Sequence, residues 1–173
     1  INGDSKFESH IKLDSPEMLY LFLDRGETNS IDNSLPFFAE PGNIKIETTL
    51  KEFFAAAKIT GSKNHDLWMK FDSINKRFNE ENLVLIEKRL KNEIKPNTTT
   101  ADSIEQAYQK LLKRKYRFTA HFAATNGSKE IAPYLALSEI ADINTPYLDT
   151  IQKSLTPEVA KSKYGKMLNE HIK

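Results

Sequence analysis

The sequence contains no cysteine. That absence excludes disulfide bonds, thiolate nucleophiles, and the zinc and iron–sulfur sites that need Cys ligands. Glycine is scarce as well: the six glycines are scattered and form neither a GxGxxG nor a GxxxxGKS/T loop, so the common nucleotide-binding loops are missing. No apolar run approaches the ~20 residues that a helix needs to cross a bilayer.

Neither sign of charge is in excess. The formal net charge is +1, which gives no general attraction to nucleic acid or to an acidic membrane. With 39% hydrophobic and 28% charged residues in a chain of 173, the composition is typical of a globular protein with one large domain or two small ones. Because the chain starts at Ile1 without an initiator Met or an apolar leader, we expect a processed or trimmed N-terminus.

Recognisable catalytic motifs are also missing, because the sequence has no HExxH, GxSxG or SxxK pattern. The adjacent pair Glu80 and Glu81 lies in a predicted helix, where such residues are mostly solvated. Ser62 enters that helix and is better explained as its N-cap than as a nucleophile. The four histidines form no short-spaced metal-binding pair: His10, His65, His121 and His171. We therefore expect no catalytic residue, no metal site and no cofactor, and we predict that the chain is not an enzyme.

The first third of the chain has the pattern of strands. Residues from Phe7 to Leu13 alternate between apolar and polar, which predicts a half-buried strand. The turn residues Asn2–Asp4 before it imply a hairpin whose first strand would lie upstream of Ile1. The run Met18–Leu23 is apolar throughout, which predicts a strand covered on both faces, and a polar loop from Gly26 to Ser34 follows it.

A turn is the strongest local signal in this region. Pro41 and Gly42 occupy the second and third positions of Glu40–Asn43, as a type II turn requires. The flanking segments, Leu35–Ala39 and Asn43–Glu47, are therefore predicted to pair as a hairpin. Gly42 should take a positive φ, so a branched residue there should strain the turn.

After residues 60–62 the apolar period becomes helical. The pattern predicts one long helix over 64–92, ended by Pro96, and a second over 101–125, ended by Asn126 and Gly127. The apolar positions of the first helical pattern are Leu67, Phe71, Ile74, Phe78, Leu85, Ile86, Leu90 and Ile94, and those of the second are Ile104, Tyr108, Leu111, Phe118 and Phe122. The short connection predicts an antiparallel helical hairpin. Three shorter helices are expected over 129–142, 146–153 and 157–171, the last two opened by Thr-Pro pairs.

These elements predict an α+β fold. We expect an antiparallel β portion over residues 1–60, a sheet or sandwich lacking its first strands, and a helical portion over residues 61–173 that packs on it. The two portions should form one combined structural unit.

Two surface features invite a functional hypothesis. Five Lys and Arg residues from Lys110 to Arg117 lie beside Tyr108, Tyr116 and Phe118, as in a surface for nucleic acid or anionic lipid. Because the whole chain is near neutral, and Glu80, Glu81, Glu87 and Glu93 of the partner helix are available for pairing, we favour a solvated helix face and expect no nucleic-acid partner.

The second feature is aromatic. Phe37, Phe38, Phe53, Phe54 and Trp68 cluster around the expected junction between sheet and helices. Such residues more often join two layers of a core, but Phe37, Phe54 and Trp68 are also candidates to line a small-ligand groove.

Several segments resemble a known family when taken in order: Pro36–Ile46, Ile59–Asn64, Ala132–Leu137, Leu155–Pro157 and Lys163–Gly165. The ordered set is similar to a domain of unknown function that precedes a thioredoxin-like, TlpA-type module in cell-envelope proteins of Gram-negative bacteria. The resemblance implies an antiparallel β portion followed by helices, export from the cytoplasm, and often a lipid anchor on an upstream Cys. The redox chemistry of such proteins lies in a CxxC module, which this sequence lacks.

The leading hypothesis is therefore a non-catalytic binding or scaffold domain of the periplasm or cell envelope, as in a possible outer-membrane lipoprotein. Its expected partner is a thioredoxin-like module or another envelope protein, and it would meet the membrane only through an upstream lipid anchor. The alternative is a small-ligand-binding domain that uses Phe37, Phe54 and Trp68. A nucleic-acid binder acting through Lys110–Arg117 is the third hypothesis.

Overall fold

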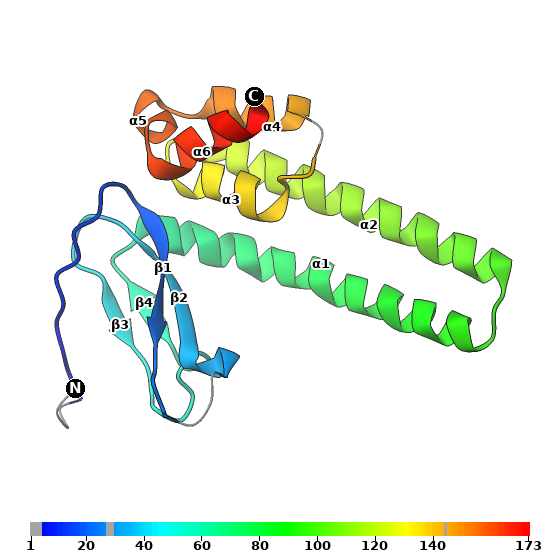
Figure 1. Cartoon of the computed structure of the whole chain (residues 1–173), viewed down its shortest axis with the longest axis horizontal. Helices are drawn as coiled ribbons and strands as arrows, with labels where there is room; N and C mark the ends of the chain where they lie inside the picture. The colour runs from blue at the N-terminus through cyan, green and yellow to red at the C-terminus, as the bar shows by residue number, and fades with distance from the viewer. Residues whose placement is uncertain (1–4, 27–29, 144) are drawn as a thin grey trace.

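The computed structural model describes residues 5–26, 30–143 and 145–173. Two small antiparallel sheets are followed by helices, which confirms the predicted α+β class (Figure 1). In chain order the described elements are β1 (Glu17–Phe22), a 3-10 helix (Ile31–Asn33), β2 (Ser34–Ala39), β3 (Lys45–Glu47), β4 (Lys58–Thr60), α1 (Lys63–Ile94), α2 (Thr98–Thr125), α3 (Ile131–Glu139), α4 (Thr145–Ser154), α5 (Pro157–Ala160) and α6 (Lys163–Ile172).

The pairing of strands differs from the predicted hairpin. Gly42 does take a positive φ of 136°, as expected for the turn. However, β2 before the turn pairs with β1, and β3 after it pairs with β4. Gly61, which follows β4, permits a close approach to the turn, because a Cβ on Gly61 would lie 2.1 Å from the carbonyl oxygen of Asn43. This close approach is compatible with the pairing of β3 with β4.

The strand predicted over Phe7–Leu13 is wrong. Described residues from Ser5 to Leu13 form no strand, and the Phe7 side chain is 61% exposed. An alternating pattern makes a strand only where a neighbouring strand supplies the ladder hydrogen bonds, and no described strand pairs with this segment. The turn predicted at Asn2–Asp4 lies outside the described residues.

The strand predicted over Met18–Leu23 is present as β1, but its coverage on both faces is wrong. Met18 is buried, whereas Tyr20 and Phe22 are exposed and stack on each other with ring centroids 6.2 Å apart. Met18, Tyr20 and Phe22 alternate onto the same face of β1, so this face is covered at Met18 and exposed at Tyr20 and Phe22. The apolar content of the segment alone could not distinguish its buried residues from its exposed ones.

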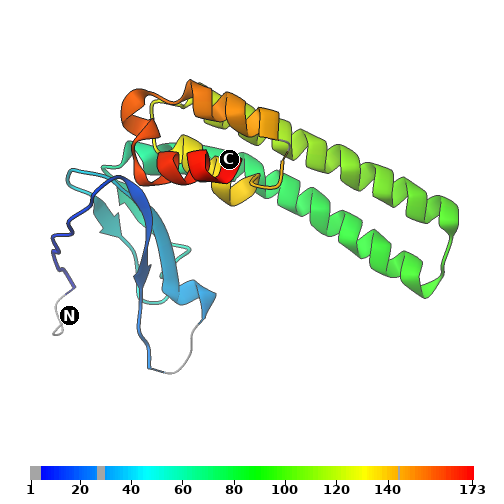
Figure 2. The same cartoon turned by 45° about the horizontal axis from the view of Figure 1, so that its top comes forward.

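The two long helices form the predicted antiparallel hairpin, which projects beyond the rest of the molecule (Figures 1 and 2). Ser62 caps α1 by accepting a hydrogen bond from the His65 N–H at 3.0 Å, as predicted. Near the base of the hairpin, rings from both helices pack together: Phe71, Phe78, Phe118 and Phe122. Toward the tip, several large apolar side chains of α1 are exposed, among them Leu83, Leu90 and Ile94.

The last part of the chain packs against the base end of α2. A core cluster joins α2, α3, α4 and α6 around Ala123, Ala136, Ile151 and Leu168. The single helix expected over 157–171 is instead split into α5 and α6. The Ser162 side chain caps α6 at the Gly165 N–H, and a Cβ on Gly165 would lie 2.1 Å from the Val159 carbonyl oxygen. Gly165 therefore permits α6 to fold back closely onto α5.

A second core cluster joins the sheet to the helices. Met18 of β1 and Phe38 of β2 pack with Phe71 of α1 and with Ile131 and Leu135 of α3. Phe38 meets the rings of Tyr134 and Tyr164 edge-on. Among the residues described, no helix is both long enough and apolar enough to cross a membrane.

Candidate functional site

The four histidines lie on different segments of the structure: His10 before β1, His65 on α1, His121 on α2 and His171 on α6. His65 is buried at the start of α1, and its Nδ1 accepts a hydrogen bond from the Phe38 N–H at 3.4 Å. Burial lowers the pKa of His65, and the nearby charge of Asp66 only partly opposes that effect. The side chain of His10 is exposed near Glu8, and His171 contacts the Ala141 carbonyl. Within the described ranges, no three His, Cys, Asp or Glu side chains are placed to hold a metal ion.

The predicted aromatic groove draws on side chains with different surroundings. Phe37 is buried on β2, whereas Phe54 lies in the turn after β3 and is 47% exposed. Trp68 on α1 is half-buried beside the His65 ring, with centroids 5.4 Å apart. Among the ring contacts of the described residues, none includes Phe37 or Phe54. The use of these three residues as a ligand groove stays a prediction.

A buried polar junction joins the loop after β2 to the starts of α1 and α3. The Asn64 side chain is almost fully buried and donates to Glu40 at 2.6 Å and to Glu130 at 2.9 Å. Its oxygen accepts a hydrogen bond from the Ile131 N–H at 2.9 Å. Every polar atom of the amide therefore has a partner, as a buried amide requires.

Glu40 also caps the start of α1, because its carboxylate accepts from the backbone N–H groups of Lys63 at 2.8 Å and Asn64 at 3.1 Å. Burial by itself would raise the pKa of Glu40, but these hydrogen bonds, the Asn64 side chain and the charge of Lys129 together lower it. A carboxylate at a helix N-terminus is also favoured by the helix dipole. The junction thus fixes the direction in which α1 leaves the sheet.

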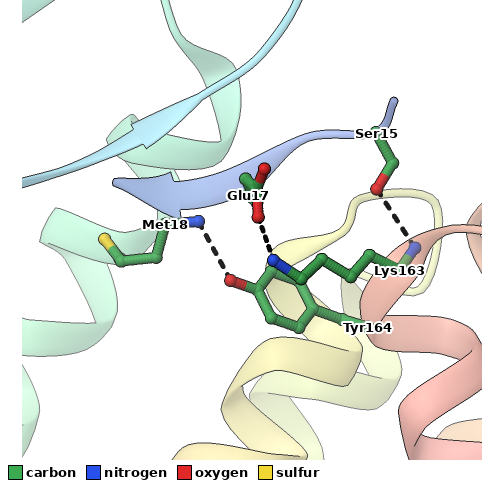
Figure 3. Close-up of polar contacts among 5 residues, drawn as sticks. All are labelled: Ser15, Glu17, Met18, Lys163 and Tyr164. Atoms are coloured by element: carbon green, nitrogen blue, oxygen red, sulfur yellow. Dashed lines mark hydrogen bonds and ion pairs between the residues drawn. The ribbon is translucent and has the colours of Figure 1, made fainter. Parts of the chain in front are cut away.

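A second set of contacts ties β1 to α6, as Figure 3 shows. The Tyr164 hydroxyl accepts a hydrogen bond from the Met18 N–H at 3.1 Å, and Ser15 accepts one from the Lys163 N–H at 3.1 Å. The Lys163 ammonium forms an ion pair with Glu17. These five residues, which we call the Tyr164 latch, join two segments from opposite ends of the chain. Together with the Asn64 junction, the latch makes the sheet and the helices of the base one connected body.

The outer half of the hairpin carries large exposed aliphatic side chains. Leu83, Ile86, Leu90 and Ile94 of α1 follow the spacing i, i+3, i+7 and i+11, which places them on one side of a helix. Leu83 is 67% exposed, Leu90 55% and Ile94 79%. The prediction that Ile86, Leu90 and Ile94 lie on the packed face of this helix is therefore wrong. We call these four residues the aliphatic ridge.

Packing with α2 in the outer half combines apolar and charged contacts, because Ile104 and Leu111 of α2 are buried and Leu85 of α1 is half-buried. Arg89 forms an ion pair with Glu105 at 3.2 Å and lies over the Tyr108 ring at 5.6 Å. Arg114 of α2 pairs with Glu81 of α1. Of the glutamates expected to pair with the basic stretch from Lys110 to Arg117, Glu81 is thus confirmed. These interactions hold the helices together while the ridge remains uncovered.

A different side of the outer hairpin is hollowed and basic. One hollow of ≈ 370 Å³ lies between the helices, with Val84, Leu85, Ala107 and Leu111 as its apolar lining and Lys110 and Arg114 beside them. A second hollow of ≈ 660 Å³ lies nearer the turn and is lined in part by Lys88, Lys91 and Lys95. Part of the basic stretch found in the sequence therefore borders an apolar groove.

The comparisons with known proteins concern only the first part of this structure. Residues 1–68 match a domain of unknown function, DUF4369. The resemblance to such a domain expected from the sequence is confirmed at this level, whereas its link to a thioredoxin-like module stays a prediction. A search of curated proteins gave no match, and a search of solved structures also gave none.

The DUF4369 match contains all four described strands and ends within the first two turns of α1, at Trp68. Of the residues that form the Asn64 junction, Glu40 and Asn64 lie inside the matched part and Glu130 lies outside it. The aliphatic ridge and both hollows are also outside it. Sequence reasoning missed Asn64 and Tyr164 because single polar residues carry no periodic signal, and their partners lie far away along the chain.

Proposed function

We propose that this chain is a non-catalytic binding or scaffold domain of the bacterial cell envelope, and that its α1–α2 hairpin presents the surface to which a partner binds. The envelope assignment rests on the sequence resemblance, of which the match of residues 1–68 to a domain of unknown function bears out only the domain type. The expected partner is a thioredoxin-like module or another envelope protein.

The aliphatic ridge is the observation that carries this proposal. Single exposed apolar residues are ordinary, but four large aliphatic side chains in one row are a surface that proteins usually cover. The Leu83, Leu90 and Ile94 side chains contribute little to the core, so their presence in this row is better explained by binding than by folding.

The base of the molecule, which comprises the sheets, α3 to α6 and the adjoining ends of α1 and α2, supports the same role (Figure 2). The Asn64 junction and the Tyr164 latch hold β1, β2, α1, α3 and α6 together, while the hairpin projects from them (Figure 2). A binding surface on a firmly held element loses less conformational entropy when a partner binds. We therefore propose that the base holds the hairpin in place and that the hairpin contacts the partner.

Site-specific photo-crosslinking in living cells tests the proposal. A photoreactive residue replaces Leu90 on the ridge, and the matched control replaces the exposed Glu158 on α5 at the base. We expect a discrete crosslinked partner from position 90 and none from position 158, with the protein recovered in the envelope fraction. Crosslinks from position 158 alone, or recovery in the cytosol, would contradict the proposal. So would turnover of a peptide or glycan that a single acidic substitution abolishes.

A further inference from the structure

The near-neutral charge of the chain conceals a strong separation along it. Residues 63–125, which form the hairpin, contain thirteen lysines and arginines and eight aspartates and glutamates, for a net charge of +5. Residues 1–62 contain six of the former and ten of the latter, for a net charge of −4, and residues 126–173 are balanced with six of each. The hairpin is thus a basic element on a molecule that is otherwise acidic or neutral.

Much of this positive charge lies on one side of the outer hairpin. On α1, Val84, Lys88, Lys91 and Lys95 follow the spacing i, i+4, i+7 and i+11, and on α2 the same spacing joins Ser103, Ala107, Lys110 and Arg114. All eight residues line the two hollows described above. We call this side the basic face. It is distinct from the aliphatic ridge, which lies on another side of α1.

Several cations of the basic face have no acidic partner among the described residues. Arg114 pairs with Glu81 and Lys91 pairs with Glu87. No ion pair among the described residues includes Lys88, Lys95 or Lys110, and all three side chains are exposed. They flank an apolar floor whose Val84 is itself 49% exposed. An anionic group with an apolar neighbour would match both features of this surface.

We infer that the basic face docks an acidic amphipathic helix of a partner protein, an inference that rests on the proposed function. A groove between two antiparallel helices suits a third helix, whose apolar side chains would cover Val84, Ala107 and Leu111 while its Glu and Asp residues meet the lysines. The distance from Val84 to Lys95 along α1 corresponds to roughly 16 Å, or about three turns of the docked helix.

The surface suits a peptide better than a bare polyanion. A phosphate chain would gain from the lysines but would leave the apolar floor uncovered. An amphipathic helix gains from both the apolar contact and the charge pairing, and the latter also orients it in the groove. The acidic residues 1–62 of a second copy are the competing source of negative charge.

The test uses the whole chain and fluorescently labelled synthetic peptides of 18 residues. The probe peptide repeats Leu and Ala at helical spacing with Glu elsewhere, and three controls replace Glu by Lys, scramble the order, or consist of Glu alone. Binding is measured by fluorescence anisotropy at low and at physiological salt. Analytical ultracentrifugation of the unlabelled chain reports self-association in the same buffers.

Two double variants reverse the same number of charges at exposed lysines. Lys88→Glu with Lys110→Glu alters the basic face, and Lys12→Glu with Lys51→Glu is the matched control in the acidic part. We expect the probe peptide to bind, to weaken with salt, and to lose at least about tenfold in affinity with the first pair but less than about twofold with the second. Val84→Ser, at an exposed position, should also weaken binding while leaving the circular dichroism spectrum unchanged.

Four results would overturn the inference. Equal binding of the all-Glu peptide would indicate a simple polyanion surface, and preferential binding of the Lys peptide would place the docking site elsewhere, such as the ridge. Self-association abolished by Lys88→Glu with Lys110→Glu would identify a second copy as the occupant. Failure of every peptide to bind would also reject it. If no peptide binds, a crosslink from position 90 in cells would still support the proposed function of the hairpin as the partner-binding element. The proposed function and the inference about the basic face can therefore be rejected independently.

Discussion

The hydroxyl of Tyr164 accepts a hydrogen bond from the Met18 N–H at 3.1 Å, although 146 residues separate the two in the sequence. The contact ties the first described strand to the last helix (Figure 3). Burial raises the pKa of the Tyr164 phenol, so the group stays neutral at physiological pH. The role of the Tyr164 latch can therefore be tested by removing the hydroxyl oxygen of Tyr164 alone.

Tyr164→Phe removes the acceptor and keeps the ring that packs on Phe38 and Tyr134. We expect a loss of about 1 kcal/mol in the free energy of unfolding, because the Met18 N–H loses its partner. Hydrogen exchange should show faster exchange at the Met18 amide. Tyr147→Phe on α4, where the side chain is exposed, is the control and should change neither quantity. Unchanged protection of Met18 in Tyr164→Phe would contradict the role of the latch.

Asn64→Ala should be among the most destabilising polar substitutions in the protein. It leaves the Ile131 N–H without an acceptor and brings Glu40 and Glu130 together without the amide between them. We expect a loss of about 2–3 kcal/mol in urea denaturation. The exposed Asn79 lies in the same helix, and Asn79→Ala should cost no more than about 0.5 kcal/mol. Similar losses for the two variants would show that the junction contributes little.

His65 should make the stability depend on pH near neutrality. Because burial lowers its folded-state pKa below the ordinary value of 6.5, the unfolded chain binds a proton more readily. The contribution of neutral His65 is therefore complete above pH 6.5 and is lost as the pH falls toward the folded-state pKa.

The substitution His65→Asn isolates this effect, since Asn offers an acceptor to the Phe38 N–H but does not titrate. We expect the free energy of unfolding to fall more steeply from pH 8 to pH 5 in the wild type than in His65→Asn, as measured by urea denaturation. His121→Asn, on the exposed side of α2, is the matched control and should follow the wild type. Parallel curves for the wild type and His65→Asn would rule out this pH dependence.

Two glycines with positive φ should respond differently to alanine. Gly42 has a φ of 136° and open space around its Cα, so Gly42→Ala should cost about 1–2 kcal/mol from backbone strain alone. Gly61 has a φ of 95°, and its new Cβ would also lie 2.1 Å from the Asn43 carbonyl oxygen. Gly61→Ala should therefore lower the melting temperature clearly more than Gly42→Ala. Equal decreases in melting temperature for the two variants would mean that the backbone near Asn43 shifts at little energetic cost to accommodate the new Cβ.

Local sequence determined much of the helical part. The hairpin of α1 and α2 was predictable because apolar spacing, the Ser62 cap and the stop at Pro96 act within a few residues of one another. Thr156 followed by Pro157 likewise predicted the start of α5, where the Thr156 side chain accepts from the Val159 N–H. The positive φ of Gly42 was predictable for the same reason.

Tertiary structure decided which partner each strand takes and which helix side remains exposed. The sequence around Gly42 predicts a turn but does not state that β2 returns to β1, since pairing depends on segments far along the chain. The apolar period of α1 continues to Ile94, yet beyond Phe78 the Leu90 and Ile94 side chains are exposed, and Arg89 and Arg114 join the two helices through ion pairs. Periodicity reports that a face is apolar, whereas burial depends on whether another element reaches it, and that is why the aliphatic ridge emerged only from the three-dimensional arrangement.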